Sequence, residues 1–221
     1  MLYVNKEFVN HYENQLTFFL SIYYNQVQKC TEGRQSTLEA FLTSHLAEQI
    51  RGLHLPRYGE LPALELYMDQ VISVIDGALH PLYPEEDAHI LTSSMVNNYV
   101  KQKIVPPPVK KRYTRNHLAY FIVMALLKQV FSIAQISTLI RRQIQCASVE
   151  AAYDRLCDEL ELTLCGVFST RQLTPPPMTE ATASSELLRS AVLSLVNKIY
   201  VEKYLEFSAQ ASVQRATDTP E

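Results

Sequence analysis

The chain has 221 residues, of which 47% are hydrophobic, and its 20 Lys and Arg against 23 Asp and Glu give a formal net charge of −3. This length suits one large or two small domains with a substantial core, and no stretch approaches the roughly 18 consecutive apolar residues of a membrane span. Only five glycines are present, and none belongs to a phosphate-cradling loop or a nucleophile elbow, so we expect neither a membrane protein nor an enzyme.

Cysteine and histidine usage argues against a disulfide scaffold and against a metal centre. The four cysteines are few and widely spaced, no charged-then-apolar leader opens the chain, and we therefore expect a cytoplasmic protein. No two histidines have the spacing of metal ligands, and the cysteines are spaced unlike a zinc site. We predict no catalytic residue, no metal site and no cofactor, with the thiols buried in the core.

Three helices are expected in the first third of the chain. Apolar residues at helical spacing predict one over residues 5–29, a second over residues 36–52 that Ser36 and Glu39 open as a capping box, and a third from Leu64 to Leu79. The first helix carries more aromatic side chains than one buried stripe needs. We interpret part of it as a subunit interface or as the lining of an effector pocket.

Further helices are expected from residue 92 onward. Thr92 or Ser93 is predicted to cap a short helix that ends near Ile104, and three prolines then force an extended path. Three more helices are expected to begin at caps and to contain the apolar runs 118–127, 133–144 and 149–164; the caps are Thr114, Ser132 and Ser148. After a second proline triplet, Ser184 or Ser185 is expected to cap a last helix that buries Leu188 through Leu205. Strand signals are nearly absent, so the predicted fold class is all-α.

Positive charge is concentrated in the middle of the chain. The 62 residues between Asp87 and Glu150 contain nine Lys and Arg and no acid, whereas the other 159 residues carry 11 cations and 23 acids. A charge run is usually a solvated face, but an acid-free segment of this length indicates a surface built to meet an anion.

The order of elements in this segment suits a winged helix-turn-helix, in which one helix enters the major groove and a basic loop contacts phosphates. The short helix is expected to expose side chains that can bond base edges, namely Ser94, Asn97, Asn98, Lys101 and Gln102. The basic loop supplies candidates for phosphate contacts, namely Lys103, Lys110, Lys111, Arg112 and Arg115. The prolines stiffen this loop, which lowers the entropy lost on docking.

A family resemblance lies in the same segment, "LTSSMVNNYVKQKIVPPPVKKRYTRNHLAYFIVMALLKQVFSIAQISTLI", residues 91–140. It resembles an uncharacterised bacterial family with a domain of unknown function, family 1836, and more loosely the MerR type of winged helix-turn-helix regulators. The positions that stand in the MerR-like places are Tyr99, Ile104 to Pro106, Arg112 with Tyr113, and Phe131 to Ile136. The MerR-like wing turns on a glycine, and no glycine lies between Gly77 and Gly166, which leaves open whether the wing is a true hairpin.

These observations lead to one functional expectation and one alternative. We expect an all-α protein with a MerR-like winged helix-turn-helix, acting as a transcriptional regulator that binds double-stranded DNA, as a homodimer, with an effector still to be identified. The alternative is a non-enzymatic adaptor whose basic face binds an acidic protein. The expected organisation is an N-terminal helical region at 1–60, the winged domain with its following helix at 61–168, a proline-rich linker at 169–184, a C-terminal helix at 185–207 and a disordered tail at 208–221.

Overall fold

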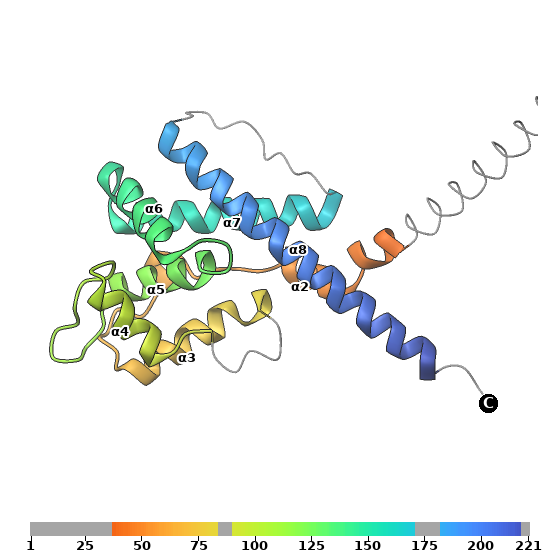
Figure 1. Ribbon diagram of the computed structural model, residues 1–221, viewed down its shortest axis with the longest axis horizontal. Coiled ribbons are helices and arrows are strands. Elements are labelled where there is room, and N and C mark those ends of the chain that lie inside the picture. The colour runs from red at the N-terminus through yellow and green to blue at the C-terminus, as the bar shows by residue number, and fades with distance from the viewer. Residues whose placement is uncertain (1–36, 84–89, 171–181, 218–221) are drawn as a thin grey trace, which may run out of the picture. The chain divides into compact units, whose positions relative to one another are not determined.

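The computed structural model describes residues 37–83, 90–170 and 182–217, with side chains up to residue 212 at the C-terminal end (Figure 1). The chain divides into two compact units, Met1–Ser44 and His45–Glu221. The predicted helix over residues 5–29 and the second proline triplet lie outside the described residues.

The first unit is described only over residues 37–44, where residues 37–42 are helical. The prediction of one unbroken helix over residues 36–52 is wrong, because a turn at Thr43 and Ser44 interrupts it. The Thr43 hydroxyl donates to the Glu39 carbonyl at 2.8 Å and the Ser44 hydroxyl donates to the Phe41 carbonyl at 2.6 Å. Hydroxyls that bond nearby carbonyls in this way compete with the helical ladder.

The second unit is built from helices, as Figure 1 shows. Its elements are α2 (His45–Arg51), the short 3₁₀ helix η1 (Tyr58–Glu60), α3 (Met68–Leu79), the 3₁₀ turn η2 (His80–Leu82), α4 (Ser93–Lys101), α5 (Arg115–Leu127), α6 (Ile133–Cys146), α7 (Val149–Thr170) and α8 (Ala183–Thr217). The only strand-like pairing within the described residues is two isolated antiparallel bridges, Leu66 with Tyr113 and Val109 with Arg112. The all-α prediction is confirmed for the part of the chain that is described.

Helix α5 is the centre of this unit. It is apolar on nearly every side, and it packs against α3, α6, α7 and α8. Phe121, Ile122 and Met124 are completely buried. A helix that is hydrophobic all round belongs inside a core, so the sequence-based placement of residues 118–127 is confirmed.

Local caps were predictable where a hydroxyl precedes an apolar run. The Thr92 hydroxyl accepts the Met95 N–H at 3.3 Å, and the hydroxyls of Ser132 and Ser148 accept the N–H groups of Gln135 and Ala151. The prediction that Ser184 or Ser185 caps α8 is wrong. The capping residue is Thr182, whose hydroxyl accepts the Ser185 N–H at 3.1 Å. The Ser185 hydroxyl in turn accepts the Thr182 N–H at 2.8 Å, which makes a reciprocal box.

Helix α8 is longer than the sequence indicated. It continues to Thr217, ten residues beyond the predicted end, so the prediction of a disordered tail from Ser208 is wrong up to that residue. Residues 208–217 contain neither Gly nor Pro, and their Ala, Gln and Arg favour helix.

Three apolar residues that the periodicity placed in the core are exposed instead. They are Leu64 at 80%, Leu205 at 61% and Ile144 at 37%. Leu64 precedes the start of α3, and on α6 the amide of Gln143 takes an inner place because its Nε2 donates to the Ser184 carbonyl at 2.8 Å. The prediction of buried thiols is confirmed for Cys157 and wrong for Cys146 and Cys165, which are exposed.

An ion pair fastens the loop before α3 to α7. The Arg57 guanidinium donates two hydrogen bonds of 2.7 Å to the two carboxylate oxygens of Glu161, and the Leu55 N–H donates to Glu161 Oε1 at 2.7 Å. Burial acts to raise the pKa of Glu161, but the hydrogen bonds from Arg57 and Leu55 outweigh it and lower this pKa. A carboxylate with a lowered pKa stabilises the fold above the ordinary Glu pKa near 4.3 and loses that contribution as the pH falls through its folded value.

Candidate nucleic-acid interface

Helix α4 presents one polar face and buries the other. Val96 and Tyr99 are buried, so the side chains at the i, i+3 and i+7 positions Ser94, Asn97 and Lys101 share the outer face, and all three are exposed. The predicted base-edge residues also include Gln102, which is exposed and donates to the half-buried Asn98 amide oxygen at 3.1 Å. This face therefore carries amide, hydroxyl and ammonium groups.

The end of α4 is closed by a lysine in a backbone conformation that glycine usually supplies. Lys103 has a φ of 57°, its N–H donates to the Val100 carbonyl at 2.9 Å, and the Ile104 N–H donates to the Tyr99 carbonyl at 3.1 Å. These two bonds are the Schellman pattern of helix ends, in which the left-handed position is normally Gly. The predicted helix end near Ile104 is thus three residues late, since the helix ends at Lys101.

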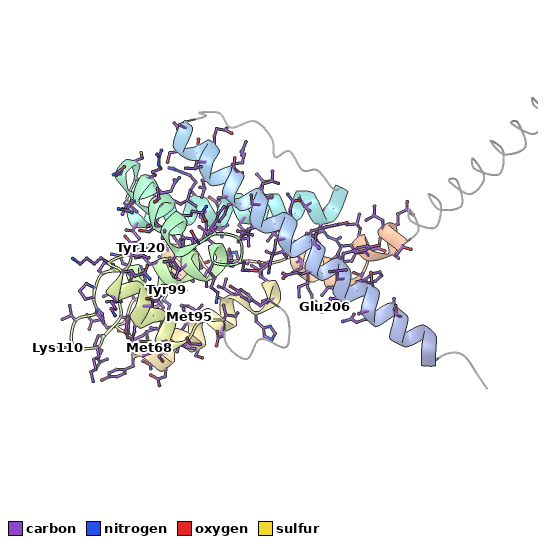
Figure 2. The ribbon with its side chains drawn as sticks, in the orientation of Figure 1. Met68, Met95, Tyr99, Lys110, Tyr120 and Glu206 are labelled. Carbon is purple, nitrogen blue, oxygen red and sulfur yellow. The ribbon has the colours of Figure 1, made fainter. Side chains whose placement is uncertain are left out.

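The basic loop turns on two further lysines. After Pro106, Pro107 and Pro108, the Arg112 N–H donates to the Val109 carbonyl at 2.8 Å, which closes a tight turn. Its central residues, Lys110 and Lys111, have φ values of 49° and 60°. Positive φ at both central positions is the signature of a type I′ hairpin turn, which Asn-Gly normally fills. Lys110 lies at the tip of the projecting loop in Figure 2.

A backbone bridge attaches this lysine turn, defined as Val109–Arg112, to the segment before α3. The Leu66 N–H donates to the Tyr113 carbonyl and the Tyr113 N–H donates to the Leu66 carbonyl, both at 2.9 Å. The Arg112 guanidinium carbon lies 3.9 Å from the centre of the Tyr67 ring, a cation–π contact. The turn is therefore held at its base by residues about 45 positions away in the sequence.

The start of α5 holds the loop from the other side. The Thr114 N–H donates to His117 Nδ1 at 3.0 Å, so the imidazole takes the place of the usual Glu or Gln of a capping box. Since Nδ1 accepts this bond, the proton of a neutral His117 is on Nε2, which is buried near the Pro106 and Pro107 carbonyls without a well-formed hydrogen bond. Burial lowers the pKa of His117, and the two carbonyls oppose this effect.

The phosphate candidates fall into two groups. Lys103, Lys110 and Lys111 are exposed, and no ion pair engages them among the described residues. Arg112 and Arg115 are half-buried and already engaged, because Arg112 stacks on Tyr67 and Arg115 Nε donates to the Leu61 carbonyl at 3.0 Å.

The outer face of α4 and the lysine turn meet in one surface hollow. Asn97 from α4 and Lys111 from the turn line it together with Tyr67, Asp69 and Tyr113. The structure thus brings a base-edge candidate and a phosphate candidate to the same place. Asp69 is the acidic member of this lining, and it lies in the first turn of α3.

Sequence reasoning missed one cation that the fold adds to this region. Arg141 of α6 lines a second hollow with Lys101 and Lys103, on the side of α4 toward α6. The signal was present, because Arg141 is one of the nine cations in the acid-free segment. Arg141 lies about 40 residues from the end of α4 in the sequence, so the sequence alone did not indicate that it lines the same hollow as Lys101 and Lys103.

Comparison with known families gives one match: a domain of unknown function, DUF1836, matches residues 56–156. This range includes α3 to α6, the lysine turn and the first turns of α7, and it supports the resemblance to that uncharacterised family. Comparisons with curated proteins and with solved structures gave no match. Across the described ranges 37–83, 90–170 and 182–217, no helix has the length and apolarity to cross a membrane, and no three His, Cys, Asp or Glu side chains are grouped to hold a metal ion.

Proposed function

We propose that this protein is a DNA-binding transcriptional regulator of the MerR-like winged helix-turn-helix type, with α4 as the recognition helix and the lysine turn as the wing. One observation carries the proposal. All three non-glycine residues with positive φ in the described chain are lysines of the basic segment: Lys103, Lys110 and Lys111. The left-handed conformation costs an L-residue about 1–2 kcal/mol, and such strain concentrates at functional sites.

The order of elements supports the winged interpretation. Leu66, which forms a β-bridge with Tyr113, precedes α3. The elements that follow α3 are α4, the lysine turn and α5, which is the order of a winged helix-turn-helix. The missing glycine left open whether the wing is a true hairpin. Lys110 and Lys111 supply the two positive φ angles that a glycine-containing turn would otherwise provide.

The chemistry proposed for each part follows from its exposure. Asn97 and Ser94 are free to bond base edges in the major groove, and Lys101 can reach a guanine edge or a phosphate. Lys110 and Lys111 at the loop tip contact phosphates, whose binding energy comes largely from counterion release. Arg112, which stacks on Tyr67, holds the base of the wing. Its second proposed role is to contact a phosphate.

Dimerisation is proposed through α8. Val201 and Leu205 lie four residues apart on one side of this helix and are 56% and 61% exposed. Two apolar side chains placed in this way suit the surface of a second copy. A two-fold dimer would read two half-sites, as helix-turn-helix regulators do.

The experiment is fluorescence anisotropy of a labelled random duplex over a range of salt concentrations. Each phosphate that the protein neutralises adds about −0.9 to the slope of log affinity against log salt, so four to five contacts give a slope of roughly −3 to −5. Lys110→Gln/Lys111→Gln should make this slope shallower by about 2. The matched control is Arg142→Gln/Arg155→Gln, which removes two cations of α6 and α7 and should leave the slope nearly unchanged.

One observation favours the alternative, an adaptor for an acidic protein. Val109, at the base of the lysine turn, is 71% exposed, and apolar side chains beside cations suit a protein partner more than a phosphate backbone. A salt-independent or absent anisotropy response would favour this alternative over DNA.

A further inference from the structure

The second hollow lies at the end of α4, beside the start of the basic loop and α6. Lys101 and Lys103 contribute to its lining from the end of α4 and the position just beyond it, and Arg141 contributes from α6. Tyr120 of α5 also lines it, and Figure 2 shows this residue in the region between α4 and α6. The lysine turn contributes no residue to this hollow. A ligand bound here is therefore distinct from one bound at the turn.

The charged residues of the second hollow are all cations. No Asp or Glu is among the described residues that line it, and no ion pair engages Lys101, Lys103 or Arg141 in the described part of the chain. Like charges gathered at one place repel each other, and a bound anion relieves this repulsion. Three cations without an acid complement a divalent anion better than a monovalent one.

The lining also holds uncommitted hydrogen-bond donors. Tyr120 and Ser137 are half-buried, and their side-chain hydroxyls form no hydrogen bond with another residue in the described ranges. Arg141 Nε donates to the Ser137 carbonyl at 3.3 Å, which leaves the two terminal nitrogens of the guanidinium for a ligand. The guanidinium fork matches two oxygens of one phosphate group.

The rest of the lining is apolar. Ile144 of α6 is 37% exposed, although helical spacing predicts a core position for it, and Val100 and Ile104 are half-buried. An apolar body placed on these side chains removes their surface and its own from water. Small-ligand sites typically combine an apolar lining with a few polar groups that fix the orientation of the ligand.

We propose that the second hollow binds a phosphate monoester whose organic body is apolar. Such a phosphate group carries a charge of about −1.5 to −2 at pH 7, in keeping with the three cations. The phosphate lies beside Lys101, Lys103 and Arg141, and the body lies on the apolar part of the lining, against Ile144.

This ligand regulates DNA binding, a step that rests on the proposed function. Lys101 and Lys103 belong both to the second hollow and to the proposed DNA contacts, so a phosphate monoester that engages them withdraws two cations from DNA. Coupling between two ligands is reciprocal: the monoester weakens DNA binding by the same factor by which DNA weakens binding of the monoester.

Titration calorimetry without DNA tests the site alone, with 1-naphthyl phosphate as the probe. Inorganic phosphate lacks the apolar body and should bind at least about 10-fold more weakly, because covering about 60 Å² of apolar surface already corresponds to that factor. 1-Naphthoate has one negative charge and should bind more weakly by about 3-fold or more, and 1-naphthol, without the anion, by at least about 10-fold. Affinity equal to that of the probe for any of these three compounds would overturn the corresponding part of the proposal, and failure of the probe to bind would overturn the site.

Variants of the cations locate the phosphate group. Arg141→Gln should weaken binding of 1-naphthyl phosphate about 3- to 10-fold, the worth of a partly exposed charge-assisted contact. Arg142→Gln removes the neighbouring exposed cation, which does not line the hollow, and should leave the affinity unchanged. Lys110→Gln/Lys111→Gln, which removes the cations of the lysine turn, should also leave it unchanged. Equal weakening by Arg141→Gln and by either control would refute the assignment of the phosphate to this hollow.

A second pair of variants locates the apolar body. Ile144→Asn and Leu162→Asn each replace a partly exposed apolar residue, at 37% and 47%, and only Ile144 lines the hollow. Ile144→Asn should weaken 1-naphthyl phosphate at least about 3-fold and leave inorganic phosphate unaffected, whereas Leu162→Asn should change neither. Circular dichroism checks that each variant is folded. Equal affinities of the two variants for the probe would contradict the placement of the body.

The regulatory step is tested separately by anisotropy with labelled duplex. Saturating 1-naphthyl phosphate should lower DNA affinity by at least about 5-fold, the lower end of usual coupling, and Arg141→Gln should reduce this response. Binding of the probe with unchanged DNA affinity would overturn the coupling. No DNA binding in the absence of the probe would overturn the proposed function and leave the ligand site standing.

Discussion

Replacing Lys110 by Asn and Lys111 by Gly should stabilise the protein and weaken its binding to DNA. Both lysines have positive φ, at 49° and 60°. Asn-Gly is the preferred pair for a turn of this type. Each left-handed L-residue costs about 1–2 kcal/mol, and the greater chain entropy of an unfolded Gly offsets about 0.5–1 kcal/mol. Only the change to Gly removes an L-residue from positive φ, and Asn tolerates this region better than Lys, so the net gain is about 1 kcal/mol, or roughly 2–4 °C in Tm for a chain of this size.

The assay pairs thermal unfolding, followed by circular dichroism, with the salt dependence of DNA binding. The Asn-Gly variant should raise Tm and make the salt slope shallower by about 2. Lys110→Gln/Lys111→Gln is the matched control, because it removes the same charges but keeps two L-residues at positive φ. It should change the slope equally and leave Tm near the wild-type value. A lower Tm for Asn-Gly than for the Gln pair would refute the strained turn.

Three further predictions concern the body of the protein. Glu161→Gln should cost about 1–3 kcal/mol at neutral pH, because it removes the bidentate carboxylate partner of Arg57 and leaves only Asp158, at 2.9 Å, as its ion-pair partner. Urea titrations should show this cost shrinking as the pH falls below about 4.5, and a pH-independent cost would contradict the lowered pKa of Glu161. Burial lowers the pKa of His117 in the folded protein, so the unfolded chain binds a proton at this residue more readily. The contribution of neutral His117 to the free energy of unfolding is therefore present above the ordinary His pKa near 6.5 and is lost as the pH falls below it. His117→Gln keeps an acceptor for the cap and should lose less stability than wild type between pH 7.5 and 5.5, so an unchanged pH dependence would exclude His117 as the cause. Finally, Val201→Glu/Leu205→Glu should convert a dimer into a monomer in sedimentation, while Ser190→Glu, an exposed change elsewhere on α8, should leave the dimer intact; a wild-type monomer would contradict the proposed α8 interface.

The sequence was informative where structure depends on near neighbours. Thr92, Thr114 and Ser132 each precede an apolar run, and each caps the helix that was predicted to follow. The all-round apolarity of residues 118–127 likewise placed α5 in the core. The sequence-based prediction failed where hydrophobic spacing favoured a helix and hydroxyl side chains favoured a turn. Thr43 and Ser44 bond back to helix carbonyls and interrupt a helix that hydrophobic spacing alone would continue.

The candidate interface was only partly predictable, because its geometry depends on distant residues. The exposed face of α4 followed from helical spacing. The lysine turn did not, since a lysine pair is not a recognised sequence signal for positive φ. The engagement of Arg112 by Tyr67 and of Arg115 by the Leu61 carbonyl joins residues about 45 and 54 positions apart, and no periodicity indicates such pairs.

The most direct test of the proposed function is the salt dependence of binding to a random DNA duplex by the wild-type protein and by Lys110→Gln/Lys111→Gln. The proposal predicts a wild-type slope of roughly −3 to −5 that becomes shallower by about 2 in the variant. Equal slopes for the two proteins, or no binding by the wild type at low salt, would contradict a DNA-binding role for the lysine turn.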